Sequence, residues 1–271
     1  MTPALSIVLL VVALSASMAL AWVVAIWTGR LTLIDAIWSL AVGIVGIAGS
    51  LAPFNGVDAI GLRQWLVAGL AAAWSLRLVL HIAARMMRGW DDPRYRELHK
   101  EWRDEFHSRL FWFLQIQAAA AVILVATILT AAHRPGADLE FGDLPGVIVF
   151  LVAIVGEAIA DQQLSRFVAA PENEGKVCDV GLWRFSRHPN YFFEWLTWVA
   201  YGLIAIDFSG AYPWGFMAFA GPVLMYWLLV NVSGIPPLEA HMLRTRGDRF
   251  REYQRRVSAF WPAPPRDFAV R

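Results

Sequence analysis

A series of long apolar segments constrains the fold of this chain more than any other feature. An α-helix needs about twenty residues to cross the roughly 30 Å hydrocarbon layer of a bilayer. Seven segments approach or reach that length, at about 5–27, 31–51, 65–84, 110–132, 147–160, 191–206 and 214–232. The sequence therefore predicts an all-α polytopic membrane bundle of about seven transmembrane helices, with a closing segment at the C-terminal end.

The composition supports a lipid environment and excludes several other classes. The chain is 58% hydrophobic and 17% charged, which is typical of a protein whose solvent is largely lipid. A net charge of +1, without a basic run among aromatic residues, argues against a nucleic-acid partner. The single cysteine, Cys178, excludes an internal disulfide and a thiolate-based metal cluster. No two histidines have metal-ligand spacing, so we expect no metal site.

Basic residues gather in three segments that a seven-helix topology places on one side of the membrane. Segments 85–109, 166–187 and 244–271 hold 19 of the 23 Lys and Arg residues. By the positive-inside rule that side is the cytoplasm, which puts the N-terminus outside. No repeat, low-complexity run or long linker divides the chain, so we expect one integral-membrane domain over residues 1–271.

Five ionisable residues fall within or at the edges of the apolar segments. They are Asp35, Arg77, His81, Glu157 and Asp161. Each costs several kcal/mol in a membrane unless it pairs or lines a wet cavity, which makes each a functional candidate. For Asp35, an ion pair with Arg77 is an equally good alternative. For Glu157 we favour a structural role, because the small residues around it allow close helix packing.

Cationic residues recur along the third apolar segment. Arg77, His81, Arg85 and Arg88 follow spacings of four, four and three, which places them in one stripe along a helix. Such a stripe suits a polyanion such as a pyrophosphate. Snorkelling of long side chains at a helix end explains Arg85 and Arg88 as well, but it does not explain Arg77.

The densest group of polar side chains lies in segment 181–194, Gly-Leu-Trp-Arg-Phe-Ser-Arg-His-Pro-Asn-Tyr-Phe-Phe-Glu. Arg184, Arg187 and His188 supply charge for a phosphate or carboxylate, and Asn190 offers a paired donor and acceptor. Glu194 follows Asn190 by four residues and shares its helix face. An aromatic belt at the membrane interface is the alternative, but the density of polar groups favours a binding site. The chain has no Gly-rich dinucleotide fingerprint, phosphate loop or nucleophile elbow.

These residues carry a resemblance to a known family. The segment above, Pro237-Leu-Glu239, and Asp248-x-Phe-Arg-Glu-Tyr253-Gln-Arg-Arg-x-Ser-Ala-Phe-x-Pro262 together resemble the membrane steroid 5-alpha-reductase family, in its bacterial branch of undetermined substrate. The core of the segment is also similar to sterol C14 and C7 reductases and, more loosely, to isoprenylcysteine carboxyl methyltransferases. The resemblance is strong over about 161–262 and weak before Leu76.

The resemblance implies an NADPH-dependent oxidoreductase in a bacterial inner membrane. Its substrate would be a lipophilic compound with a carbon–carbon double bond conjugated to a carbonyl, as in steroid or other lipid metabolism. The nucleotide site would lie mainly in 77–109 and 161–262, and the substrate cavity mainly in 1–84 and 110–165. The cofactor-binding residues would be Arg77, Arg85, Arg88, Asp161, Lys176, Arg184, Arg187, His188, Asn190, Tyr191, His241, Arg244 and Tyr253.

The chain departs from the steroid enzymes at the substrate end. Those enzymes are understood to use a Tyr in the third span and a Gln-Glu pair in the second, and these places fall near Trp74 and Asp35 here. Trp74 cannot donate a proton, so Asp35 and Glu194 are the catalytic candidates. A desolvated Asp35 would favour its neutral, proton-donating form. We expect Trp38 and Trp74 to contact the substrate.

The closing segment also departs, because the family carries Arg and His where this chain has Ile235 and Glu239. His241 and Arg244 are expected to substitute for them.

Two other functions stay open. The same pocket would hold S-adenosylmethionine in a methyltransferase of a lipidic substrate, although that reaction needs neither the acid at Asp35 nor a cationic stripe. The third alternative is a lipid-binding membrane protein that has kept only the fold. Loss of the Arg-His-Pro-Asn-Tyr set would indicate such a protein, and here the set is intact.

Overall fold

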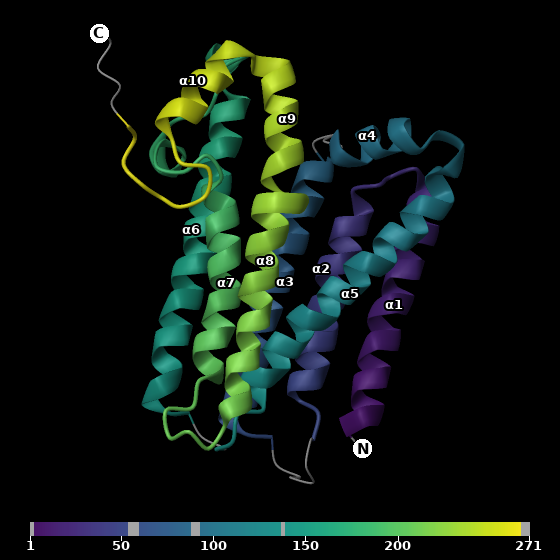
Figure 1. Ribbon diagram of the computed structural model, residues 1–271, viewed down its shortest axis with the longest axis vertical. Helices are drawn as coiled ribbons and strands as arrows, with labels where there is room; N and C mark the ends of the chain where they lie inside the picture. Colours follow the sequence, from purple (N-terminus) through teal and green to yellow (C-terminus); the bar gives the residue numbers. More distant parts are fainter. Residues whose placement is uncertain (1–2, 54–59, 88–92, 137–138, 267–271) are drawn as a thin grey trace. The chain divides into compact units, whose positions relative to one another are not determined.

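The computed structural model describes residues 3–53, 60–87, 93–136 and 139–266, and these residues form helices and connecting loops without a strand (Figure 1). The chain divides into two compact units. The first comprises Met1–Gly146 and Tyr201–Gly221, and the second comprises Val147–Ala200 and Pro222–Arg271. The all-α prediction is confirmed, and each predicted site residue that the structure describes belongs to one of the two units.

Four long helices make up most of the first unit. They are α1 (Pro3–Thr28), α2 (Leu33–Ser50), α3 (Leu62–Met87) and α5 (Phe106–Ala132), and the short helices α4 (Pro93–Trp102) and η1 (Arg103–Glu105) precede α5. In Figure 1, α1, α2 and α3 lie side by side and α5 crosses them obliquely. Small residues bring α2 and α3 together, because a Cβ atom on Gly43 would lie 2.3 Å from the Cβ of Ser75.

A buried ionic cluster closes one end of the first unit. Arg63 at the start of α3 donates to Asp143 at 3.1 Å and to the carbonyl of Arg134 at 3.1 Å. Arg134 pairs with Asp143 at 3.0 Å and donates to the carbonyl of Ile206 at 2.7 Å. Arg63 and Arg134 are 1% and 4% exposed, so these bonds compensate charges that water cannot solvate.

The second unit contains most of the remaining helices. They are α6 (Leu144–Ala169), η3 (Pro171–Asn173), η4 (Gly181–Arg184), α7 (Pro189–Ala205), α8 (Ala220–Trp227), the π-helical η6 (Leu228–Val232), α9 (Ile235–Arg246) and α10 (Asp248–Arg256). One end of each of α6, α7 and α8 belongs to the first unit, as do η2 (Phe141–Asp143) and η5 (Pro213–Phe219).

The structure confirms the predicted membrane bundle and changes its boundaries. Six helical stretches among the described residues are long and apolar enough to cross a membrane, namely 5–28, 33–50, 62–87, 98–132, 141–169 and 213–246. The segment predicted at 191–206 forms α7, which has 17 residues. The prediction at 147–160 was too short, because α6 continues through Asp161, Gln162 and Gln163 to Ala169. Polar residues end a hydrophobic run without ending a helix.

Candidate functional site

The carboxylate of Glu239 is the centre of a buried polar cluster in the second unit. Arg187 donates to both of its oxygens, from Nε at 2.7 Å and from an η nitrogen at 3.2 Å. His188 Nε2 lies 3.0 Å from Oε1, and Gln254 Nε2 donates to Oε2 at 2.6 Å. A carboxylate only accepts, so His188 carries a proton on Nε2. Segment 181–194 is therefore tied directly to α9 and α10.

Hydrogen bonds to backbone carbonyls fasten the same segment to the residues after α10. Arg187 donates to the carbonyl of Val257 at 2.6 Å from its side chain and to that of Ser258 at 2.8 Å from its backbone N–H. Ser186 donates from Oγ to the carbonyl of Phe260 at 3.0 Å. These bonds confirm a C-terminal segment that closes over the 181–194 segment. They also occupy much of the hydrogen-bonding capacity of Arg187, which was predicted to bind cofactor.

On its other side, the segment is fastened to α6. Gly181 has a φ of +58°, and a Cβ atom there would lie 2.5 Å from the amide of Gln163. That amide accepts a hydrogen bond from the backbone N–H of Leu182 at 2.8 Å. The indole of Trp183 donates to the carbonyl of Ala160 at 2.9 Å. Only glycine meets both demands at 181, a positive φ and a close approach.

Two buried acceptor atoms at the start of α7 have no hydrogen-bond partner among the described residues. They are Nδ1 of His188 and Oδ1 of Asn190. The Asn190 amide donates weakly, at 3.5 Å, to Oδ1 of Asp161, and the His188 ring stacks on Tyr191 with 5.4 Å between centroids. Because buried polar atoms in proteins are nearly always hydrogen-bonded, these two acceptors mark a place for a ligand that donates.

Burial keeps His188 neutral. It lowers the pKa of His188, and the bond to Glu239 offsets only part of that effect, while the positive charge of Arg187 adds to the lowering. A neutral ring with its proton on Nε2 has a lone pair on Nδ1. The unpartnered atom of His188 is therefore an acceptor.

Glu194 lies one helical turn after Asn190 and is 8% exposed. The indole of Trp198 donates to its Oε1 at 3.0 Å. Asn190 and Glu194 both lie on α7, so the prediction that they share a helix face is confirmed. The hydrogen bond from Trp198 fixes the orientation of the Glu194 carboxylate.

The remaining candidates of the second unit differ in their exposure to solvent. Lys176, Arg184 and Arg244 are exposed, and His241 is partly exposed. Tyr253 is buried, and its hydroxyl donates to the carbonyl of Trp183. Burial raises the pKa of Tyr253 well above its usual range, so its hydroxyl stays protonated and holds the fold together.

The candidates at the predicted substrate end belong to the first unit. Trp38 and Trp74 meet edge to face, with 6.3 Å between ring centroids. Asp35 lies in the first turn of α2. Arg77 and Arg85 both lie on α3, as predicted. Arg88 lies outside the described residues, and the Asp35–Arg77 ion pair stays a prediction.

Sequence reasoning missed three residues that the structure makes prominent. Glu239 was noted only as a departure from the family, and neither Gln163 nor Arg63 was singled out. An acid two residues after Pro237 and an amide in α6 carry no local signal of their own. Their roles depend on partners 52 and 19 positions away in the chain.

Comparison with known proteins places the chain in a family. Residues 21–257 match the family described as "Protein of unknown function (DUF1295)". The chain belongs to this family. It is a steroid 5-alpha-reductase-like family, so the resemblance seen in the motifs holds at that level, and the particular branch stays a prediction.

A distant relative has no assigned function. The "Uncharacterized protein C594.04c" of Schizosaccharomyces pombe is 26% identical over 268 residues, which cover 89% of this chain and 75% of the relative. No solved structure matches the chain.

Proposed function

We propose that this protein is an NADPH-dependent membrane reductase, which reduces a carbon–carbon double bond conjugated to a carbonyl in a lipophilic substrate. One observation carries the proposal. The buried acceptors His188 Nδ1 and Asn190 Oδ1 lie without partners at the start of α7, beside the carboxylate of Asp161. The nicotinamide of NADPH bears a carboxamide, whose two N–H donors complement such acceptors.

The residues present fit this cofactor at both of its ends. Asn190, His188 and Asp161 would hold the carboxamide end. Phosphates need cations that are not already paired. Arg184 and Lys176 are exposed and form no salt bridge within the described part of the chain. Arg187 fits this role less well, because its guanidinium is bonded to both oxygens of Glu239. NADPH, when bound, supplies the hydride.

The residues of the chain would then position the cofactor and the proton-transfer groups rather than form covalent bonds with the substrate. Glu239 holds His188 in one tautomer, which presents the lone pair of Nδ1 as an acceptor. Trp198 holds the buried carboxylate of Glu194 by a hydrogen bond. This carboxylate would accept or donate a proton close to the nicotinamide. Asp35 is the candidate acid at the substrate carbonyl.

Binding of NADPH and of S-adenosylmethionine to the purified full chain in detergent tests the proposal. We expect NADPH to bind and to stabilise the protein against heat, and S-adenosylmethionine not to bind. Asn190→Ala should weaken NADPH binding by at least tenfold, whereas Asn231→Ala, an exposed asparagine in η6, should leave it unchanged. Binding of S-adenosylmethionine instead would favour the methyltransferase, and binding of neither would overturn both enzyme proposals.

A further inference from the structure

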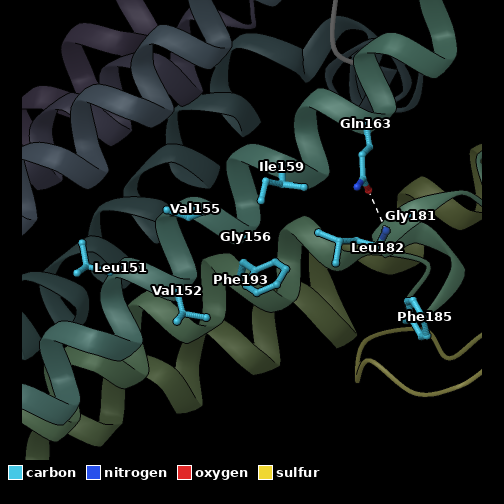
Figure 2. A pocket seen from close by; sticks show the side chains of 10 residues that line it. All are labelled: Leu151, Val152, Val155, Gly156, Ile159, Gln163, Gly181, Leu182, Phe185 and Phe193. Atoms are coloured by element: carbon cyan, nitrogen blue, oxygen red, sulfur yellow. Dashed lines mark hydrogen bonds between the residues drawn. The ribbon is translucent and has the colours of Figure 1, made fainter.

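An apolar groove runs along the second unit on α6 (Figure 2). It has a volume of about 650 Å³. Figure 2 shows four aliphatic side chains of α6 along it, with Phe193 of α7 beside them and Phe185 near the far end. Its lining consists of Leu151, Val152, Val155, Gly156, Ile159, Gln163, Gly181, Leu182, Phe185 and Phe193.

Gly156 and Phe193 form the floor of the groove. A Cβ atom on Gly156 would lie 2.3 Å from the ring of Phe193, so the ring packs flat against bare helix backbone. The aliphatic side chains beside it point outward, and Leu151, Val152 and Val155 are each more than half exposed. In a helix that is apolar enough to cross a membrane, such side chains face hydrocarbon rather than water.

One end of the groove is polar. The Gln163 amide accepts the N–H of Leu182, and its own NH₂ group donates to no residue in the described part of the chain. Arg166 follows Gln163 by three residues on α6 and so lies on the same helix face. Arg166 is exposed. A ligand in the groove would therefore meet a hydrogen-bond donor and positive charge at this end only.

The groove is distinct from the proposed nucleotide site. Asp161, which contacts Asn190, lies two residues before Gln163, and two residues turn an α-helix by about 200°. The acid and the groove therefore occupy opposite faces of α6. From Leu151 to Gln163 the helix rises about 18 Å at 1.5 Å per residue, which is a little more than one leaflet of the hydrocarbon layer.

We propose that this groove binds one hydrocarbon chain of an anionic membrane lipid, with the headgroup beside Gln163 and Arg166. The length of the groove, its apolar walls and the positive charge at one end all match such a lipid. A zwitterionic lipid would fill the walls equally well but would gain less from the cations. The proposal does not depend on the proposed reductase activity.

Photo-crosslinking locates the lipid. The full chain is placed in phosphatidylcholine vesicles that contain a phosphatidylglycerol with a diazirine in one acyl chain, and crosslinked peptides are identified by mass spectrometry. We expect crosslinks to concentrate on 151–163 and on Phe193. Val152→Trp and Ile159→Trp, which fill the groove, should each reduce them at least fivefold. The matched control Ile148→Trp changes an exposed residue of α6 outside the groove and should not reduce them.

Competition tests the headgroup. Unlabelled phosphatidylglycerol should compete better than phosphatidylcholine, and Arg166→Gln should reduce that preference roughly fivefold, whereas Arg255→Gln on α10 should not. Equal competition by the two lipids would overturn the anionic specificity. Crosslinks spread evenly over the lipid-facing helices, or a groove covered by a second copy of the chain, would overturn the site itself. NADPH binding, measured on the same variants, should be unchanged and so reports separately on the proposed function.

Discussion

Arg187 donates hydrogen bonds to both carboxylate oxygens of Glu239, at 2.7 and 3.2 Å. The two side chains are only 11% and 12% exposed, so the pair is largely shielded from water. It joins the most distinctive segment of the sequence to the closing helices α9 and α10.

Removing one partner of this pair should destabilise the protein strongly. Glu239→Ala leaves the charge of Arg187 buried and uncompensated, which costs about 3 to 5 kcal/mol. Thermal unfolding in detergent, followed by circular dichroism, should show a clear fall in Tm. Glu252→Ala removes an exposed acid of α10 and should change the Tm little. Equal Tm values for the two variants would contradict the proposed closing role of Glu239.

The stability of the protein should fall in mild acid because of His188. Burial lowers the pKa of His188 in the folded state, while the unfolded residue titrates near 6.5. Below about pH 6.5 the unfolded state therefore binds more protons, and the free energy of unfolding decreases as the pH falls. This contribution is fully present above about pH 6.5 and is lost toward the lower folded pKa.

Comparison of variants isolates that contribution. The slope amounts to at most about 1.4 kcal/mol per pH unit for one group. His188→Gln should flatten the profile of stability between pH 5 and 7, and His107→Gln, at an exposed position, should not. If the free energy of unfolding of His188→Gln changed with pH as steeply as before, another group would be responsible for the loss of stability in acid.

Gly181→Ala should cost more than the backbone conformation alone explains. The new Cβ atom would meet the Gln163 amide at 2.5 Å, in addition to the strain of a φ of +58°. Gly247 has a φ of +55° with nothing within 4 Å, which makes Gly247→Ala a matched control. Overpacking costs typically 1 to 3 kcal/mol, and we expect Gly181→Ala to be less stable than the control by about that amount. Similar Tm values would contradict the close packing of Gln163 on Gly181.

The whole ionic cluster of the first unit should lose stability when one of its members is changed. Asp143→Asn removes the charge that both Arg63 and Arg134 contact, and loss of one partner in a buried network costs about 3 to 5 kcal/mol. Glu105→Gln weakens an exposed pair with Arg109 and should cost less than about 1 kcal/mol. A Tm of Asp143→Asn equal to that of the control would mean that water reaches the cluster.

Asp35 can be tested once turnover is measured. If its carboxyl protonates the substrate, Asp35→Asn should lower kcat by at least a hundredfold and leave NADPH binding unchanged. Asp179→Asn, at an exposed position of the second unit, controls for loss of an acid. Full turnover by Asp35→Asn would exclude it as the proton donor.

Local patterns predicted much of the fold and part of the candidate site. The helical periodicity around Asn190 and Glu194 correctly placed them on one face of α7, because helix geometry depends only on residues close in sequence. The predicted end of α6 came too early, because a fall in hydropathy indicates where the chain leaves the hydrocarbon layer and not where the helix ends.

The amino-acid sequence by itself determined that this chain forms apolar helices of membrane-spanning length and carries one dense polar segment at 181–194. Only the tertiary structure decided that Glu239 neutralises Arg187 and fixes His188, that Arg63 meets Asp143, and that Gln163 lies against Gly181. The reason is physical. A hydrophobic run depends only on the solvent around it, whereas the partner of a buried charge is set by the folded chain. Here the partners lie 52 positions apart for Arg187 and Glu239 and 80 positions apart for Arg63 and Asp143.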